Sequence, residues 1–476
     1  MVAFQNKQRN FSRWYRQVLF DANIIDQRYP VQGCVVWKSY GTKIMENIME
    51  ILETFLDKTG HSKTHFPLLI PEDLFSKETR HLRGFENQIY WVTKAGKQRL
   101  NRKLVIRPTS ETAMYEMLSL WIRSHRDLPI KIYQTVSVFR YETKSTKPLI
   151  REREMWPFNE AHTTHATIKE AEKQTKIGIQ IYKKLFRRLA LPYLLVQKPK
   201  WELFPGAINA FEFYTLMPDG KVLETGSVNN LGQAFSRVFN IKFEKTDGSH
   251  EYAYQTCYGQ SERLLASIIA IHGDDHGIVL SPSIAPILVV IVPILYADTS
   301  EAVVNYAKSI ERNLKKRRFT VTLDLREETP GEKFHYWEKL GVPIRLETGP
   351  KEVDNRTVTM VRRDTLLKQI VPLENLAEEV KILLKQIDRN LWRRATQSLR
   401  QKITLASNLM GAIEQIEEGS AVIQVFWCGD EKCRCQVEEK TATETIGFTV
   451  SRKSKKEKCL ICGKKAKETI CLAKSY

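Results

Sequence analysis

Apolar residues recur at helical spacing in the segment between Gly41 and Gly60. They stand three or four positions apart, at Ile44, Ile48, Ile51, Leu52 and Phe55. This spacing predicts an amphipathic helix that Gly60 ends as a C-cap. The apolar run 64–71 that follows contains Pro67 and ends in a proline, so we expect an edge or interface strand there rather than a central one.

Strand patterns dominate the region up to about residue 283, with helices packed outside them. The strand patterns cover 104–107, 131–140, 212–216 and 221–225, and a long helical pattern covers 168–189. From Ile287 the sequence changes to a continuous apolar strand, followed by a helix at 300–316 and a strand at 319–325, a β-α-β unit typical of a parallel sheet. Helical patterns at 373–387 and 392–418 lead into a cysteine-rich tail.

The net charge of +19 is spread along the chain and favours a polyanionic partner such as nucleic acid. Any single basic run is better explained as a solvated face or loop, so only the total supports this interpretation. No uninterrupted apolar stretch has the length of a membrane span, and the N-terminus lacks an apolar signal core. We therefore expect a cytoplasmic protein with no membrane partner and with reduced cysteines.

Six of the eight cysteines crowd residues 428–476, in an arrangement typical of a metal site. Cys428 and Cys433 form one short pair, and Cys459 and Cys462 form another. Four thiolates suit a tetrahedral zinc ion. By spacing alone, Cys435 competes with Cys433 as a ligand.

Charged residues alternate in two segments, 138–142 and 148–154, which we expect to be strands joined by a polar loop. A charged face of this kind can bind a nucleoside triphosphate. Taken alone, it is also consistent with the ordinary surface charge of an antiparallel hairpin.

The order of several motifs resembles class II aminoacyl-tRNA synthetases. Phe139-Arg-Tyr-Glu142 is similar to their second motif, Gly259-Gln-Ser-Glu-Arg263 to their third, and the 41–60 helix with Pro67 to their first. Within that class the resemblance is to prolyl-tRNA synthetases of the archaeal and eukaryotic type, and it covers nearly the whole chain. It rests on Arg107-Pro-Thr-Ser-Glu-Thr112, Arg151-Glu-Arg-Glu154, Glu160-Ala-His-Thr-Thr-His165 and His272-Gly-Asp-Asp275.

The resemblance implies an α/β multidomain protein. It predicts a class II catalytic core built on an antiparallel sheet at 1–283, an α/β anticodon-binding domain at 284–400 and a small α+β zinc-binding domain at 401–476. The implied activity is proline activation with ATP and Mg²⁺ and transfer to tRNA(Pro), by a homodimer with structural Zn²⁺. Because the second and third motifs lie close together, no editing domain is expected between them.

The resemblance also assigns roles to matching residues. Arg140 would bridge the substrate carboxylate and the α-phosphate, and Arg263 would stack on adenine. Glu142, Arg151, Glu224 and Ser227 would complete the ATP site, with Glu224 also a candidate ligand for Mg²⁺. Thr109 and Glu111 would bind the secondary ammonium of proline, and Phe158, Glu160, His162 and Asn229 would wall its pocket.

In the anticodon-binding domain, the candidates for tRNA contact are Lys333, Phe334, Arg345, Glu347 and Lys351. Loop charges that only aid solubility remain the alternative for each of them. In the tail, the family's spacing favours Cys433 over Cys435, which gives Cys428, Cys433, Cys459 and Cys462 as zinc ligands.

The sequence departs from the family at several positions near the pocket. Asn209, Glu212, Glu224 and Asn229 replace the family's usual residues. A drift in substrate choice is therefore one alternative, in which a paralogue activates another imino acid or a small amino acid. A catalytically silent tRNA-binding module is a second alternative, but the intact Arg140, Glu142 and Arg263 argue against it.

Overall fold

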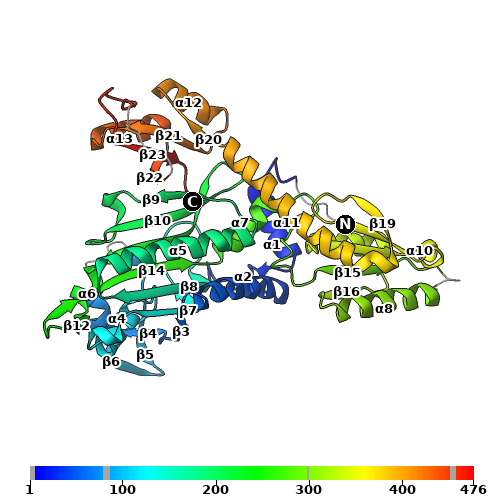
Figure 1. Cartoon of the computed structure of the whole chain (residues 1–476), viewed down its shortest axis with the longest axis horizontal. Coiled ribbons are helices and arrows are strands. Elements are labelled where there is room, and N and C mark those ends of the chain that lie inside the picture. The colour runs from blue at the N-terminus through cyan, green and yellow to red at the C-terminus, as the bar shows by residue number, and fades with distance from the viewer. Residues whose placement is uncertain (1–5, 79–85, 297–299, 451–456) are drawn as a thin grey trace.

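The computed structural model describes residues 6–78, 86–296, 300–450 and 457–476. An 11-stranded sheet runs through the catalytic and C-terminal regions, and a separate five-stranded sheet lies beside it (Figure 1). The large sheet has the order β20-β21-β23-β22-β9-β10-β11-β14-β8-β7-β3. Its first-region strands are β3 (Ser62–Lys63), β7 (Ile130–Phe139), β8 (Glu154–His165), β9 (Leu194–Gln197), β10 (Asn209–Leu216), β11 (Val222–Gly232) and β14 (Tyr254–Gln260).

Helices cover one face of this sheet and form the main core with it. The long helix α5 (Ile168–Arg188) begins at a capping box made by Thr167 and Glu170, and it packs on β8, β11 and β14. Around it lie α1 (Phe11–Asp21), α2 (Ser39–Asp57) and α7 (Arg263–His272). The other face carries α4 (Glu111–Trp121) and α6 (Ala234–Val238), which bury a second apolar cluster against β7 and β14.

Three small sheets lie in the same region of the chain. They are β1 (Ile25–Asp26) with β2 (Val36–Trp37), β12 (Lys242–Glu244) with β13 (His250–Tyr252), and β4 (Leu69–Pro71) with β6 (Gln98–Ile106) and β5 (Tyr90–Ala95). The short helix α3 (Glu72–Glu78) follows β4. Of the strand predicted at 64–71, only the last three residues form a strand, β4; β3 ends just before the run, and Pro67 lies in neither strand.

The second unit contains the predicted β-α-β element. Its sheet has the order β16-β15-β17-β18-β19, with β15 parallel to β16 and β17 and the rest antiparallel. The strands are β15 (Val289–Pro293), β16 (Val321–Leu323), β17 (Ile344–Thr348), β18 (Thr357–Arg362) and β19 (Lys368–Pro372), and the helices are α8 (Ser300–Lys316), α9 (Pro330–Lys339) and α10 (Pro350–Asn355).

The prediction of two helices at 373–387 and 392–418 is wrong. One helix, α11 (Leu376–Gln401), spans the gap because buried residues continue at i,i+4 spacing through Leu383, Ile387, Leu391, Ala395 and Leu399. It then stops, and β20 (Ile403–Leu405) and α12 (Leu409–Glu417) take the place of the predicted second helix. Both Ile403 and Thr404 are β-branched, which favours a strand over a helix.

The C-terminal region joins the catalytic sheet directly. It contains β21 (Val422–Trp427), α13 (Glu431–Thr441), β22 (Glu444–Thr449) and β23 (Glu468–Ala473). Strand β22 pairs antiparallel with β9, Phe448 opposite Gln197 and Thr449 opposite Val196. Around this junction Trp201 lies edge-on to Trp427 and Phe448, so aromatic packing supports the strand pairing.

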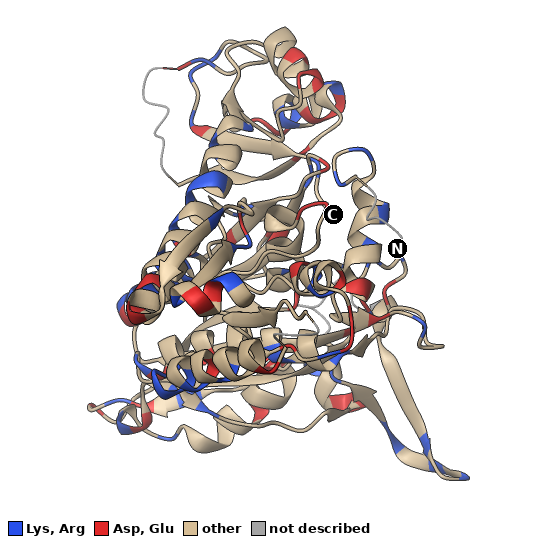
Figure 2. Cartoon of the chain, turned by 90° about the vertical axis from the view of Figure 1, so that its right-hand side faces the viewer, with Lys and Arg blue, Asp and Glu red and all other residues tan. Residues whose placement is uncertain are grey.

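Basic residues occur in every part of the molecule rather than at one end (Figure 2). Among the described residues, no helix has both the length and the apolar character needed to cross a bilayer.

The close packing of α2 against the backbone of Ile24 depends on Gly41. A Cβ built on Gly41 would lie 2.7 Å from the Cα of Ile24, and backbone cannot yield as a flexible side chain does. We expect Gly41→Ala to destabilise the protein by roughly 1–3 kcal/mol, the usual cost of overpacking. The measurement is the midpoint of thermal unfolding.

Gly331→Ala is the matched control for this test. Gly331 also lies in the first turns of a helix, but its added Cβ would meet no atom within 4 Å. That variant should keep the parent midpoint or exceed it, because alanine is the better helix former. Equal behaviour of the two variants would contradict the explanation.

Candidate active site

Alternation along β8 places three predicted pocket residues on one face of the large sheet. Phe158, Glu160 and His162 are two positions apart, so their side chains share a face. The register with β14 puts Gly259 opposite Glu160 and Cys257 opposite His162. A Cβ on Gly259 would lie 3.6 Å from the ring of Phe158, so the absence of a side chain there leaves space above the sheet.

Two carboxyl groups meet at the start of α4. The hydroxyl of Thr109 lies in hydrogen-bonding contact with Glu111 and 3.1 Å from Oε1 of Glu160. Ser110 donates to Glu160 through its backbone N–H, at 3.3 Å, and through its hydroxyl. Gln134, opposite Glu160 on β7, donates to the Ser110 hydroxyl at 2.6 Å and fixes this arrangement.

Burial raises the pKa of both carboxyls, and the nearby Glu111 raises that of Glu160 further. In the empty site, the surroundings therefore do not fully stabilise the ionised carboxylates of Glu111 and Glu160. A ligand that brings an ammonium group with two N–H donors would compensate both carboxyls at once.

Beyond the two carboxyls, the same face of the sheet carries His162, Cys257 and Asn229. The hydroxyl of Tyr115 lies 3.0 Å from Nδ1 of His162, and burial lowers the pKa of His162 to about 4, so its ring is neutral at pH 7. One potential ligand atom each of Glu111, His162 and Cys257 lie within 4.8 Å of one another. The side-chain amide of Asn229 lies 3.6 Å from the sulfur of Cys257, so this replacement residue lines the pocket.

Arginines collect at the other end of the site. Arg140 lies in the loop after β7, where its Nε donates to the carbonyl of Pro108 at 3.0 Å and its guanidinium lies 5.9 Å from the centre of the Phe158 ring. Burial lowers its pKa, and the charge of Glu160 opposes that shift. Arg140 therefore lies between the two carboxyls, Glu111 and Glu160, on one side and Arg263 on the other.

Arg263 begins α7 and is held from two sides. Its Nε donates to the carbonyl of Ile150 at 3.0 Å, and its Nη1 lies 3.2 Å from the carbonyl and 3.6 Å from the carboxylate of Glu224. Nε of Arg151 lies 3.8 Å from the carboxylate of Glu142, in the loop between β7 and β8. These two arginine–carboxylate pairs and Arg140 form a charged surface of the kind that positions phosphates.

The substituted positions near the pocket do not all face it. Ser227 lies opposite Glu212, and both share the pocket face with Asn229. The carboxylate of Glu212 lies 3.2 Å from Nζ of Lys198, and burial raises its pKa to about 7. Asn209 pairs with Asn230 on the opposite face, because successive residues of a strand alternate faces, so this substitution does not face the site.

In the second unit, four of the five predicted tRNA contacts lie close to internal partners. The guanidinium of Arg345 lies 4.1 Å from the ring centre of Phe334 and pairs with Glu347 at 3.0 Å. Lys333 is 3% exposed and donates to the carbonyl of Asp324, which differs from the expected exposed phosphate contact. Lys351 lies exposed on α10.

Four cysteine sulfurs converge in the C-terminal region. Those of Cys428, Cys433, Cys459 and Cys462 lie within 4.8 Å of one another. They come from the end of β21, from α13 and from the turn before β23. Cys435 is exposed and lies outside this group, so the fold selects Cys433 from the two alternatives. Four thiols at this spacing are the donor set that tetrahedral zinc prefers.

The sequence interpretation missed several residues that hold the site together. Ser110 and Gln134 position Glu160, Tyr115 positions His162, and Cys257 faces the pocket from β14. Strand alternation could have placed Gln134 and Cys257 on the pocket face. Ser110 and Tyr115 carry no such signal, because their roles depend on how α4 meets the sheet.

Comparison with known proteins agrees with this geometry. The family model described as tRNA synthetase class II core domain (G, H, P, S and T) matches residues 90–272, and the one described as anticodon binding domain matches 288–383. The model described as prolyl-tRNA synthetase, C-terminal, matches 410–476. The chain is 45% identical to a proline–tRNA ligase of Pyrococcus abyssi and 47% identical to one of Sulfurisphaera tokodaii, with 100% of each chain covered.

The chain belongs to the prolyl-tRNA synthetase family. A solved structure described as Giardia lamblia prolyl-tRNA synthetase in complex with prolyl-adenylate has a TM-score of 0.96 at 33% identity, with 100% of both chains covered. The prolyl-tRNA synthetase of Cryptosporidium parvum, complexed with halofuginone and AMPPNP, has a TM-score of 0.95 at 32% identity and covers 100% of this chain and 99% of its own. The family and the fold class predicted from the sequence are confirmed.

Glu262, the residue before Arg263, is a buried acid whose effect on stability depends on pH. It is 1% exposed, and its Oε2 has no hydrogen-bond partner in the described part of the chain. Burial raises its pKa from 4.5 to about 8. The folded protein therefore binds this proton more tightly than the unfolded chain. The stability that the bound proton adds is present below pH 4.5 and is lost as the pH rises toward 8.

We expect Glu262→Gln, which stays neutral, to gain stability over the parent across this range, by up to about 1.4 kcal/mol per pH unit. Thermal unfolding in the absence of ligands at several pH values measures the difference. The control is Glu374→Gln, at an exposed position. A stability difference between Glu262→Gln and the parent that stays constant from pH 4.5 to 8 would rule out the explanation.

Proposed function

We propose that this chain activates L-proline with ATP to form prolyl-adenylate and then transfers the prolyl group to the 3′ end of tRNA(Pro). The observation that carries the proposal is the joining, through Arg140, of a two-carboxyl ammonium pocket to a surface of arginines. Full-length identity to proline–tRNA ligases supports the choice of substrate. The Asn229 substitution leaves the ammonium-binding end intact.

In the first step, a carboxylate oxygen of proline attacks the α-phosphorus of ATP. A new P–O bond forms, the bond to the β-phosphate oxygen breaks, and pyrophosphate leaves. Little covalent chemistry is required of the protein beyond positioning and charge stabilisation. Thr109, Glu111 and Glu160 hold the ammonium, and Arg140 meets both the carboxylate and the α-phosphate.

The remaining ATP contacts come from the arginine end. Arg263 stacks on adenine, Glu142 lies near the adenine amino group, and Arg151 faces the γ-phosphate side. Ser227 and Glu224 lie on β11. Mg²⁺ would be held by the phosphates and Glu224. In the second step, a hydroxyl of the terminal tRNA ribose attacks the activated carbonyl and AMP leaves.

Arg140 provides the direct test of this mechanism. Its positive charge should stabilise the negative charge that grows on the α-phosphate during transfer, so Arg140→Ala should slow proline-dependent pyrophosphate exchange on the order of 100- to 1,000-fold. Binding of tRNA should stay nearly unchanged. Unaltered exchange in this variant, with the parent active, would mean that the motif assignment is wrong.

The second unit is proposed to bind the anticodon. Phe334 and Arg345 offer a stacking platform for an unstacked base, Glu347 offers an acceptor for a guanine edge, and Lys351 offers charge for phosphate. Lys333 would act by positioning the 324–333 segment through its bond to Asp324. We assign the three domains to 1–283, 284–400 and 401–476, supported by the positions of the matching family models.

Zinc is the proposed occupant of the four-cysteine cluster. The cluster ties the turn before β23 to β21 and α13, so the ion would have a structural role. We expect one zinc per chain by elemental analysis. We also expect Cys459→Ser to lose the metal and to lower the thermal midpoint rather than to abolish adenylate formation directly, because the site is structural. The control is Cys435→Ser, at an exposed cysteine outside the cluster, which should keep both the metal and the midpoint.

We further propose a homodimer that uses α2 and the segment around Pro67. Strand β3 is the edge of the large sheet, and Leu68 and Leu69 next to Pro67 are 41% and 44% exposed. Trp121, 45% exposed, packs on Phe66 beside them. An exposed apolar edge of this kind is typical of an interface between subunits.

We also propose that the chain acts in the cytosol, where tRNA charging takes place, and carries no editing domain between its second and third motifs. Residues 166–253 support the second point, because they form α5, β9, β10, β11, α6 and the β12–β13 hairpin, which belong to the large sheet or pack beside it.

A further inference from the structure

The second half of α11 is basic and entirely free of acidic residues. From Arg389 to Ala412 the sequence contains no Asp or Glu, whereas the first turn of the same helix carries Glu378 and Glu379. Arg389, Arg393, Arg394 and Arg400 are exposed within this stretch. The charge is therefore concentrated at the end of the helix that points toward the C-terminal region.

These arginines are not used to stabilise the fold by ion pairing. In the described part of the chain no carboxylate oxygen lies within 4.0 Å of Arg389, Arg393, Arg394 or Arg400, whereas the neighbouring Arg362 pairs with Asp364 at 2.7 Å. Two of the four donate hydrogen bonds to neutral groups. Arg393 donates to the side-chain oxygen of Asn390, and Arg394 donates to the carbonyl of Asp364, both at 3.2 Å.

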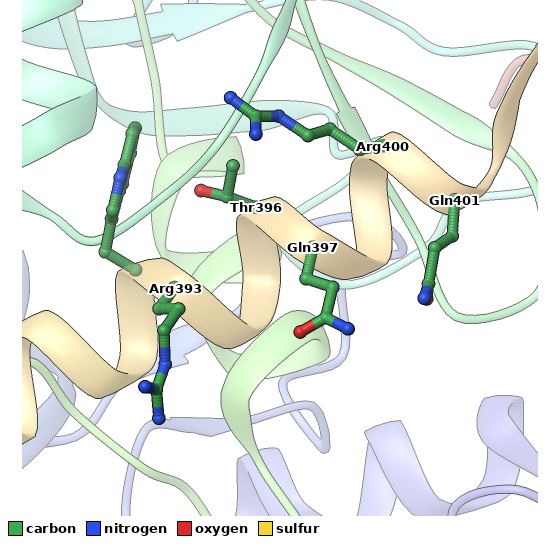
Figure 3. Close-up of a pocket in the computed structure, with 6 residues that line it drawn as sticks. Arg393, Thr396, Gln397, Arg400 and Gln401 are labelled. Atoms are coloured by element: carbon green, nitrogen blue, oxygen red, sulfur yellow. The ribbon is translucent and has the colours of Figure 1, made fainter.

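The arginines border hollows on the helix surface. One, of about 470 Å³, is lined by Trp392, Arg393, Thr396, Gln397, Arg400 and Gln401. In Figure 3, Arg400 and Thr396 extend to one side of the helix and Arg393, Gln397 and Gln401 to the other. A second hollow, of about 360 Å³, shares Arg393 and is lined by Arg362, Thr365, Gln386, Arg389, Asn390 and Arg393. We call the two together the arginine groove.

The lining chemistry matches a nucleic-acid backbone. Guanidinium groups bind phosphate oxygens, and the amides of Gln and Asn and the hydroxyl of Thr can bond to phosphate and sugar. From Arg389 to Arg400 the groove runs along about 16 Å of helix, the length of several nucleotides. Neither hollow is lined by an acidic side chain, and the carboxylate of Asp364, which contacts Asn390, is paired with Arg362, so repulsion of a row of phosphates is small.

The position of the groove indicates which part of the RNA would bind. Helix α11 runs from the five-stranded sheet to the C-terminal region, above α5 and α7 of the catalytic region (Figure 1). Arg362 and Thr365 come from the end of β18 and the turn after it, so the groove begins on the anticodon-binding unit. Arg187 of α5 stacks over Trp392, with 4.9 Å from its guanidinium to the ring centre, and pairs with Asp388 at 3.3 Å, so it joins α5 to the start of the groove.

We propose that the arginine groove binds the sugar-phosphate backbone of tRNA(Pro) between the anticodon loop and the acceptor end. This inference rests on the proposed function and names a binding surface outside both the active site and the predicted anticodon contacts. Its role is to hold the body of the tRNA while the two ends are read and charged. Binding through it should be independent of base sequence and sensitive to salt.

The test compares Arg393→Ala/Arg400→Ala with a control on the same helix, Lys381→Ala/Lys385→Ala. Both controls are exposed and precede the acid-free stretch, Lys381 by about 12 Å or more along the helix. The arginine variant should raise the KM for tRNA on the order of tenfold at moderate salt. It should also reduce the slope of log KM against log salt by roughly 0.7–0.9 per lost phosphate contact. The lysine control should resemble the parent.

Proline-dependent pyrophosphate exchange without tRNA separates this proposal from the proposed function. An arginine variant with parental exchange and a raised tRNA KM supports the groove. A tRNA KM and salt slope equal to those of the lysine control would overturn it. A parent with no proline-dependent exchange would instead overturn the proposed function.

Discussion

The register of β8 between β7 and β14 is the constraint on which the catalytic site depends. It sets Glu160 beside Gln134 on one neighbour and Gly259 on the other, so that the carboxyl is held from one side and left open above the strand. A slip of one residue would turn Phe158, Glu160 and His162 into the core and bring Asn159 and Ala161 to the surface of the pocket. The sheet therefore specifies chemistry as well as shape.

Several charged groups of the site are buried without being fully neutralised by neighbouring charges. Glu111, Glu160 and Arg140 all lie where burial disfavours their charged forms, and hydrogen bonds from Thr109 and Ser110 compensate only in part. Such a site is costly when empty and gains most from a ligand that is itself both positively and negatively charged. An amino acid meets that requirement, with its ammonium toward the carboxyls and its carboxylate toward Arg140.

Much of this architecture could be predicted from the sequence, and the failures have physical causes. Helices such as α5 and α8 carry strong periodicity, and the motif residues Arg140 and Arg263 were placed by resemblance. The single helix α11 was divided in two, although its buried i,i+4 row continues through Leu391. The face on which Asn209 lies could not be predicted, because strand register, which decides it, is set by neighbours that are distant in sequence.

The supporting partners were harder to predict. Ser110, Gln134 and Tyr115 have no sequence mark that separates them from ordinary core residues, and their roles appear only when α4 is docked on the sheet. The choice between Cys433 and Cys435 was likewise decided by geometry. On α13 one sulfur turns inward toward the other three while its neighbour two positions later is exposed.

The pairing of β22 with β9 makes the C-terminal region a cover for the rim of the catalytic sheet. Without it, β9 would present unpaired backbone N–H and C=O groups to solvent, which is the feature that lets one sheet recruit a strand from another molecule. The C-terminal region thus covers this side of the catalytic sheet, and β20 becomes its edge strand. Local unfolding around the four cysteines would therefore expose the backbone edge of β9.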